Sequence, residues 1–278
     1  MYKVFFTVRN RMAITCKAIT ALKRHSVIPH QIYVYDNLTS YRIPEHFVYW
    51  AMLYEKGIIS QVTFTSKEST FNCFSKGVTS NLFGLQHEQD LNKDSYNFLL
   101  FLDNDIIVTP GFDEILYKAW NDINKHKMDN IKVVGQIPGG IKSITHLTYS
   151  IGGVEAVTGK IGGSAFWSVR PNFFRDVGYL NLNSLLGLNK GHDIETWGLL
   201  DRATKGKDYI LGLKHKLCMH TGKYAGSCCN VLTRNKNLQE TEKEKLIRFE
   251  KAEEEIDKMS FDEFYEKVSK DPNVAKDW

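Results

Sequence analysis

Two aspartates interrupt a long apolar stretch in the first half of the chain. Residues 98–112 read FLLFLDNDIIVTPGF, where Asp103 and Asp105 flank Asn104. Alternate side chains of an extended segment point to the same side, so a strand that ends near Leu102 would present both carboxylates together. Mg²⁺ and Mn²⁺ prefer such hard oxygen ligands. The sequence therefore predicts a divalent metal site, and the alternative is a tight turn, which Asp and Asn also favour.

The first half of the chain alternates apolar runs with helical periodicity, and these elements must position the aspartates. We predict strands at 3–8, 31–37, 61–66, 96–102 and 131–137, and helices at 11–25, at 71–87 and from Thr109 or Pro110 onward. Strand, helix and strand in succession form right-handed βαβ units with a parallel sheet. Continuous apolar character marks the fourth strand as a central one, buried on both faces. Ligands bind beyond the carboxyl ends of such strands, which is where the aspartates stand.

The second half of the chain is less regular. Residues 138–169 are rich in Gly, Ser and Thr, so we expect loops and small strands beside the sheet. Binding residues concentrate in such loops. From residue 238 onward, charged helix formers predict two helices, the second of which opens with a capping box of Ser260 and Glu263. The first of the two has an apolar stripe made of Leu246, Phe249, Ile256 and Met259.

The composition is that of a folded globular protein. The chain has 278 residues, of which 42% are hydrophobic and 24% charged, and this is enough for one large α/β domain with an appendage. Residues 238–278 carry 8 Lys and Arg against 13 Asp and Glu, so the total charge of +4 divides into −5 there and +9 in residues 1–237. A basic main body suits phosphate-bearing ligands.

The sequence carries no recognisable secretion signal or membrane span. The N-terminal apolar run is too short for a signal-peptide core, and no stretch approaches the roughly 20 apolar residues of a membrane helix. Five cysteines at irregular spacing do not resemble a disulfide framework. Cys218, His220, Cys228 and Cys229 also lack the paired spacing of a zinc site. We therefore expect a cytoplasmic protein.

Residues 98–116, FLLFLDNDIIVTPGFDEIL, resemble the D-x-D segment of the GT-A fold glycosyltransferases, particularly the family 2-like enzymes. The resemblance covers most of residues 3–224. It implies an α/β fold with a doubly wound, Rossmann-like, mostly parallel sheet and a C-terminal helical appendage. The expected parts are a catalytic domain at 1–237, with a nucleotide-sugar half at 1–137 and an acceptor half at 138–237, and the charged helices at 238–278.

The resemblance implies a metal-dependent transfer of a sugar from a nucleoside diphosphate sugar, with a UDP-sugar favoured, to a hydroxyl acceptor. In these enzymes the D-x-D residues hold Mn²⁺ or Mg²⁺ against the donor diphosphate, which assigns Asp103 and Asp105 as ligands and Asn104 as a donor-binding neighbour. A histidine after a terminal strand is often the third ligand. This implies that role for His220 in LCMHTGKY.

The same resemblance implies a set of donor-binding residues near the strand ends. Thr7 and Arg9 in FFTVRNR would hold the nucleoside, and Asp36 in VYDN would bond to the base with Asn37 beside it. Lys76 in NCFSKGV would be the basic residue that faces the nucleotide. Each has a plainer reading, as a surface charge, a turn former or a solvated helix residue.

A second acidic segment, GHDIETWGLL at 191–200, is similar to the family's catalytic region. Asp193 keeps the position of the general base that deprotonates the acceptor hydroxyl in an inverting transfer. The usual Glu-Asp pair is His192 and Asp193 here, so Glu195 is a second candidate base and His192 a candidate acceptor ligand. The alternative is a charged helix N-terminus whose carboxylates favour the helix dipole.

The acceptor side rests on GGSAFWSVRPNFFRDVGYL, which resembles the family's glycine-containing strand. Gly162 and Gly163 would allow close approach of the acceptor, Trp167 would be a sugar platform, and Trp197 would join them. The acceptor itself would be a glycan or a hydroxymethylated base in DNA. A +9 main body permits a polyanion, but its Lys and Arg are dispersed rather than aligned.

Two other functions fit part of the pattern. A sugar-phosphate nucleotidyltransferase also combines a doubly wound sheet with aspartates, but residues 7–15, TVRNRMAIT, lack the glycine-rich triphosphate loop it needs. A non-catalytic nucleotide- or glycan-binding protein would not need Asp103, Asp105 and Asp193. For the C-terminal helices we expect packing on the catalytic domain or a role in a homodimer.

Overall fold

The structure is a computed structural model that describes residues 1–8, 11–37, 43–65, 72–90, 95–136, 144–160, 165–183, 192–221, 242–271 and 274. Its strands are β1 (Tyr2–Val8), β2 (His30–Asn37), β3 (Gln61–Thr65), β4 (Leu99–Asp103), β5 (Ile106–Val108), β6 (Val133–Gln136), β7 (Ile144–Ile151), β8 (Val154–Gly159), β9 (Phe166–Val169), β10 (Ile210–Leu213) and β11 (Cys218–His220). Its helices are α1 (Met12–His25), α2 (Ile43–Glu55), α3 (Asn72–Gln89), α4 (Phe112–Lys125), α5 (Phe173–Val177), α7 (His192–Ala203), α8 (Glu242–Asp257) and α9 (Phe261–Lys270).

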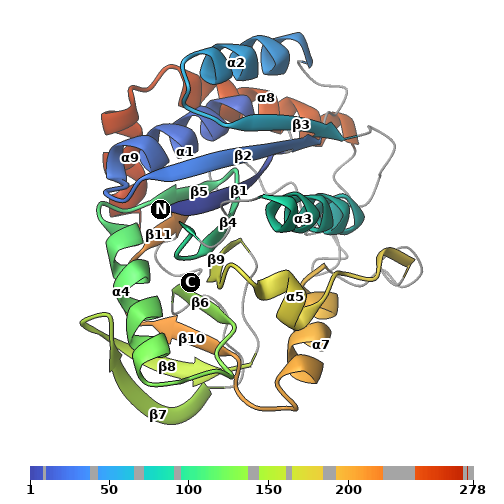
Figure 1. Cartoon of the computed structure of the whole chain (residues 1–278). Helices are drawn as coiled ribbons and strands as arrows, with labels where there is room; N and C mark the ends of the chain where they lie inside the picture. Colours follow the sequence, from blue (N-terminus) through green and yellow to red (C-terminus); the bar gives the residue numbers. More distant parts are fainter. Residues whose placement is uncertain are drawn as a thin grey trace.

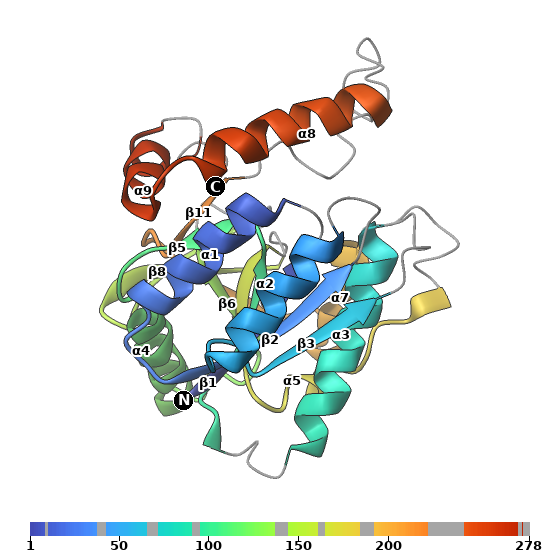
Figure 2. The same ribbon diagram turned by 90° about the horizontal axis from the view of Figure 1, so that it is seen from above.

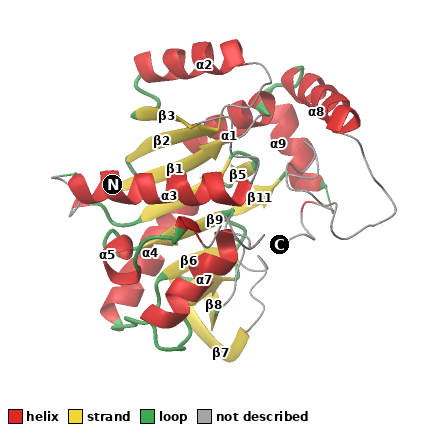
Figure 3. Cartoon of the chain, turned by 90° about the vertical axis from the view of Figure 1, so that its right-hand side faces the viewer, coloured by secondary structure: helices red, strands yellow, loops and turns green. Residues whose placement is uncertain are grey.

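The centre of the molecule is a sheet that has nine strands within the described residues, in the order β3-β2-β1-β4-β9-β6-β10-β8-β7 (Figure 1). The first four pair in parallel, as the βαβ pattern predicts. β4 ends at Asp103, one residue later than expected. Thr7 lies opposite Asp103 and Val8 opposite Asp36 in the strand register. The carboxyl ends of three neighbouring strands therefore share one edge, the side on which β5 and β11 form a separate two-stranded sheet (Figure 3).

The strands of residues 138–169 belong to the main sheet, so the expectation that they lie beside it is wrong. β9 lies between β4 and β6 and is antiparallel to both, with Leu99 opposite Val169. β8 pairs with β10, and β7 forms the far edge. The physical reason is that β8 and β9 are placed by partners that lie tens of residues away in the sequence, and β7 follows as the hairpin partner of β8.

Helices cover both faces of the sheet. One buried cluster gathers side chains of α1, α2 and α4, including Leu22, Trp50 and Leu116. A second cluster, on the face of α3, α5 and α7, includes Phe83, Phe174 and Leu200. α2 is not among the helices predicted from the sequence, and its strongest local signal is Pro44 in its first turn. No helix in the part of the chain that the structure describes has the length and apolar character to cross a membrane.

The C-terminal helices α8 and α9 lie against α1 (Figure 2). The predicted capping box of α9 is present, because Ser260 and Glu263 bond to each other's backbone N–H groups. Lys17 on α1 donates from Nζ to the carbonyl of Met259 at 2.5 Å. The buried apolar side chains of both helices belong to the same cluster as those of α1. This confirms the expected packing on the main body, while the homodimer stays a prediction.

Candidate active site

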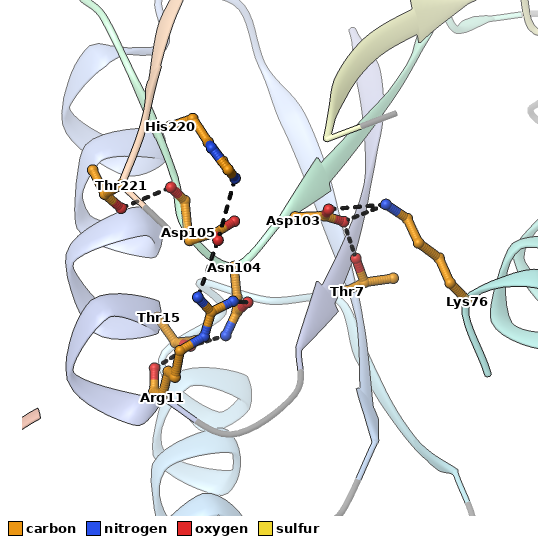
Figure 4. A network of polar contacts seen from close by, with 9 residues as sticks. All are labelled: Thr7, Arg11, Thr15, Lys76, Asp103, Asn104, Asp105, His220 and Thr221. Carbon is orange, nitrogen blue, oxygen red and sulfur yellow. Dashed lines mark hydrogen bonds and ion pairs between the residues drawn. The ribbon is translucent and has the colours of Figure 1, made fainter. Parts of the chain in front are cut away.

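The end of β4 presents Asp103 to side chains from two other elements (Figure 4). Thr7, its register partner on β1, donates from Oγ1 to Asp103 Oδ1 at 2.7 Å. Lys76 on α3 places Nζ 2.7 Å from Oδ1 and 2.9 Å from Oδ2. The Asp103 side chain is 28% exposed and that of Lys76 is 18% exposed. Asp103 is therefore a partly exposed carboxylate at the sheet edge, neutralised by one lysine.

Asp105 is turned into the protein, and its side chain is only 8% exposed. Arg11 donates from Nη1 to Asp105 Oδ2 at 3.0 Å and from Nη2 to Asn104 Oδ1 at 2.9 Å. Asn104 in turn donates from Nδ2 to Thr15 Oγ1 at 2.9 Å. Residues 104 and 105 form a turn between β4 and β5, so the expected extended segment with both carboxylates on one side is wrong. Arg11 and Thr15 supply the hydrogen-bond partners of the Asn104 and Asp105 side chains in this turn.

His220 reaches Asp105 through the pairing of β11 with β5, which sets His220 opposite Ile106. The imidazole Nε2 lies 3.4 Å from Asp105 Oδ2. Thr221, the next residue, donates from its backbone N and from Oγ1 to the carbonyl oxygen of Asp105, at 2.8 and 2.7 Å. Both the carboxylate and the carbonyl of Asp105 therefore fix the strand that carries His220.

Opposite effects determine the pKa values of this pair. Burial alone would raise the pKa of the Asp105 carboxyl, but the charge of Arg11 and the contact with His220 outweigh it and hold the pKa well below its usual range. Burial would lower the pKa of His220, but the contact with Asp105 and its charge raise that pKa above the ordinary value. Asp105 is therefore an ionised acceptor throughout the neutral range.

The expected metal ligands come together only in part. Among the described residues, no group of three or more His, Cys, Asp or Glu side chains has the arrangement of a metal centre. Asp105 and His220 face each other, whereas Asp103 faces Lys76 and Thr7 (Figure 4). A carboxylate and an imidazole fit Mn²⁺ or Mg²⁺, which complete their coordination with water and phosphate oxygens. Asp105 and His220 are therefore ligand types that fit a divalent ion. Asp103 is two residues from Asp105 in the sequence, but its carboxylate contacts Lys76.

Asp36 stands at the end of β2 and is fully buried. Its Oδ2 accepts hydrogen bonds from His46 Nδ1 at 2.7 Å and from Trp50 Nε1 at 2.6 Å. Both donors belong to α2, so the Asp36 carboxylate connects that helix to β2 through two hydrogen bonds. Asn37 is also buried, at the last position of β2. The expected contacts of these two residues with a base stay predictions.

The two tryptophans assigned to the acceptor are core residues, so that assignment is wrong. Trp167 on β9 and Trp197 on α7 are 2% and 8% exposed, and their rings lie 6.0 Å apart. Trp167 also packs on Phe101 at 4.8 Å, and Trp197 stacks on Tyr209 at 6.1 Å. A sugar platform needs an exposed ring face, and Trp167 has none because its ring packs among those of Phe101, Phe173 and Trp197.

Part of the expected site lies outside the described residues. Arg9, Gly162 and Gly163 are among them, as are the side chains of His192 and Asp193. The backbone of α7 begins at His192, so His192 and Asp193 are in its first turn. Glu195, the second candidate base, is a partly exposed residue of the same helix. Their catalytic roles stay predictions.

Arg11, like Thr15 and Thr221, belongs to the site but is not among the residues predicted from the sequence. It stands directly before α1 with a left-handed backbone, φ 58°, and is 2% exposed. The available signal was a charged residue at a helix start where Ser, Thr, Asp or Asn is usual. Its partners are 93 and 94 positions away, which no local pattern reveals.

Of the three comparisons with known proteins, only the one with solved structures finds matches. No protein-family model matches it, and no curated protein matches it. PcManGT, a mannosyltransferase from Pyrobaculum calidifontis solved with GDP-Man and Mn²⁺, has a TM-score of 0.50 at 9% identity, over 78% of this chain and 55% of that one. GalNAc-T7, solved with UDP, GalNAc and Mn²⁺, has a TM-score of 0.51 at 10% identity, over 78% and 43%.

TarS of S. aureus is a third match, with a TM-score of 0.49 at 16% identity over 78% of this chain. The chain spans 36% of the length of TarS, 55% of PcManGT and 43% of GalNAc-T7. The matches to PcManGT and GalNAc-T7, together with the mostly parallel sheet and its helical layers, show that the chain has the GT-A glycosyltransferase fold.

Proposed function

We propose that the chain is a glycosyltransferase that moves a sugar from a nucleoside diphosphate sugar to a hydroxyl acceptor. The observation that carries this proposal is the position of Asp103 and Asp105 at the carboxyl edge of a GT-A sheet, each against a cationic side chain. PcManGT was solved with GDP-Man and GalNAc-T7 with UDP. We favour a UDP-sugar as the donor, and a glycan before DNA with a hydroxymethylated base as the acceptor.

The donor diphosphate would lie at the edge formed by Asp103, Asp105 and His220. A bound Mn²⁺ or Mg²⁺ would neutralise the charge that develops on the leaving diphosphate. Asp105 and His220 would hold this ion, and Asp103 would join them. The proposal is supported by the 3.4 Å approach of His220 to Asp105 and by the Mn²⁺ in both structures of similar fold.

Two cationic side chains, Arg11 and Lys76, would hold the aspartates of this site in place. Arg11 keeps Asp105 ionised and fixed, because two of its nitrogens bond to the aspartate and to its neighbour Asn104. Lys76 neutralises Asp103 and is close enough to the sheet edge to meet a phosphate oxygen when the donor binds. In an inverting transfer, Asp193 would take the proton of the acceptor hydroxyl, with Glu195 as the second candidate.

The test is transfer or donor hydrolysis across UDP-, GDP- and CDP-sugars with Mn²⁺. We expect activity in the wild type, its loss with a chelator, and a decrease of at least about 100-fold in Asp103→Asn and His220→Ala, since each removes a group that meets charge at the reaction centre. Asp129→Asn is the control, because that carboxylate is 84% exposed and pairs with Arg170 at 3.8 Å. Full activity in both site variants would refute the mechanism, and product NMR distinguishes inversion from retention.

A further inference from the structure

The first turn of α1 is stabilised by a side chain from the other end of the chain. The residue before this helix, Arg11, makes no side-chain capping bond. Glu253 on α8 accepts a hydrogen bond from the backbone N–H of Ala13, with Oε2 at 2.6 Å. The first N–H groups of a helix have no partner within the helix and favour a negative charge. Glu253 therefore supplies the cap that the local sequence lacks.

Glu253 is not a surface residue that happens to reach α1. It is 2% exposed, and Ile256, three positions later on the same face of α8, is also 2% exposed. A buried carboxylate costs free energy unless its oxygens are bonded. By contrast, the Arg24–Asp262 pair, which also joins α1 to the C-terminal helices, is solvent-exposed. The Glu253 contact is therefore a buried one, and it is made at the start of α1.

The capped turn is the one that holds the Asp-Asn-Asp segment. Thr15 donates from its N and Oγ1 to the carbonyl of Arg11, at 3.0 and 2.7 Å, and accepts from Asn104. The Arg11 guanidinium then bonds to both Asn104 and Asp105. The contacts run without a gap from Glu253 through Ala13 and the first turn of α1 to Asp105 and His220.

We propose that Glu253 is a positioning residue of the donor site, acting through Arg11. The C-terminal helix α8 is then a part of the nucleotide-binding machinery rather than an appendage. The inference rests on the proposed function, since the ligand it serves is the nucleoside diphosphate. It assigns a role to the acidic segment that the D-x-D resemblance does not cover.

The first test measures binding of UDP, GDP and CDP by calorimetry with Mn²⁺. Glu253→Ala removes the cap and should weaken the tightest of the three by about tenfold, the scale of a lost helix cap. Glu253→Gln keeps an acceptor oxygen and should stay within about threefold of the wild type. Asp262→Asn is the matched control, since it removes the exposed α1–α9 pair and leaves the first turn intact, so its affinity should equal that of the wild type.

A double-mutant cycle separates positioning from general destabilisation. If Glu253 acts through Arg11, then Glu253→Ala should add little to the loss of affinity already caused by Arg11→Lys. Asp262→Asn combined with Arg11→Lys should be additive. Losses that add fully in the Glu253 and Arg11 pair would overturn the inference.

A ligand-free measurement keeps the inference testable if the proposed function fails. The Thr221 amide, bonded to the carbonyl of Asp105 at 2.8 Å, should exchange its hydrogen at least about fivefold faster in Glu253→Ala and at the wild-type rate in Asp262→Asn. Unchanged exchange, or an equal increase over the whole sheet, would refute positioning. If the wild type binds none of the three nucleotides, the proposed function is wrong and the exchange result alone decides the inference.

Discussion

Identical residue types in the Asp-Asn-Asp segment have different roles because their surroundings differ. Asp103 is 28% exposed against Lys76, whereas Asp105 is 8% exposed against Arg11. The sequence predicts that both are site residues, because they follow a buried strand. It cannot distinguish their roles, because the side chains that do so come from β1, from Arg11 directly before α1 and from α3, 27 to 96 positions away.

Asp36 allows a prediction about a buried acceptor. In Asp36→Ala the Nδ1 of His46 and the Nε1 of Trp50 lose their shared partner, and we expect the free energy of unfolding to fall by about 3 kcal/mol. Asp36→Asn keeps an acceptor oxygen and should lose clearly less. Urea unfolding of both variants measures this. An equal decrease in the free energy of unfolding would show that the negative charge of Asp36, rather than its acceptor oxygen, stabilises the fold.

At the scale of elements, the βαβ half of the fold follows from local patterns, and the other half does not. β1 to β4, α1 and α3 match their predicted bounds to within two or three residues, because burial on both faces and helical periodicity are properties of one segment. The position of β9 between β4 and β6 is a property of three segments together. α2 has apolar residues on nearly all sides, with Val48 70% exposed and Trp50 fully buried, so its sequence shows no clear periodicity.

The packing of α3 on α5 gives a test at this scale. A Cβ added at Gly84 would lie 2.6 Å from two ring atoms of Phe174. Phe174 is 4% exposed, and its ring packs against those of Phe83, Phe101 and Tyr179. Gly84→Ala should therefore cost about 1–3 kcal/mol despite the better helix propensity of alanine. Gly198→Ala on α7, whose nearest contact is Arg202 at an ordinary 3.6 Å, should be neutral or stabilising. Thermal melts of the pair check this, and equal melting temperatures would contradict the close approach.

At the scale of the molecule, the described part of the C-terminal segment shares one core with the main body. Ile256, Phe264 and Val268 belong to the same buried cluster as Ile19 and Leu22 of α1. The proposed boundary between residues 237 and 238 lies outside the described residues. A change of composition marks a new set of helices, but their buried faces complete the core of the sheet.

Phe264→Ala tests this common core. Phe264 is fully buried, so its truncation should lower the free energy of unfolding by about 3–5 kcal/mol. Because the cluster is shared, we expect calorimetry to show one transition moved to lower temperature. The surface variant Ser269→Ala should melt as the wild type does. Two separate transitions in Phe264→Ala would instead mark the C-terminal helices as an independent unit.

The pairing of β5 with β11 has a consequence for how the protein is made. Asp105 leaves the ribosome long before His220, and Glu253 follows later still. The parallel strands β1 to β4 can assemble on the nascent chain, since N-terminal portions fold first during synthesis. The proposed donor site cannot be completed until β11 and α8 have emerged from the ribosome, because β11 carries His220 and α8 carries Glu253. A translation product that stops before residue 218 would therefore carry both aspartates without the strand and the helix that hold them in place.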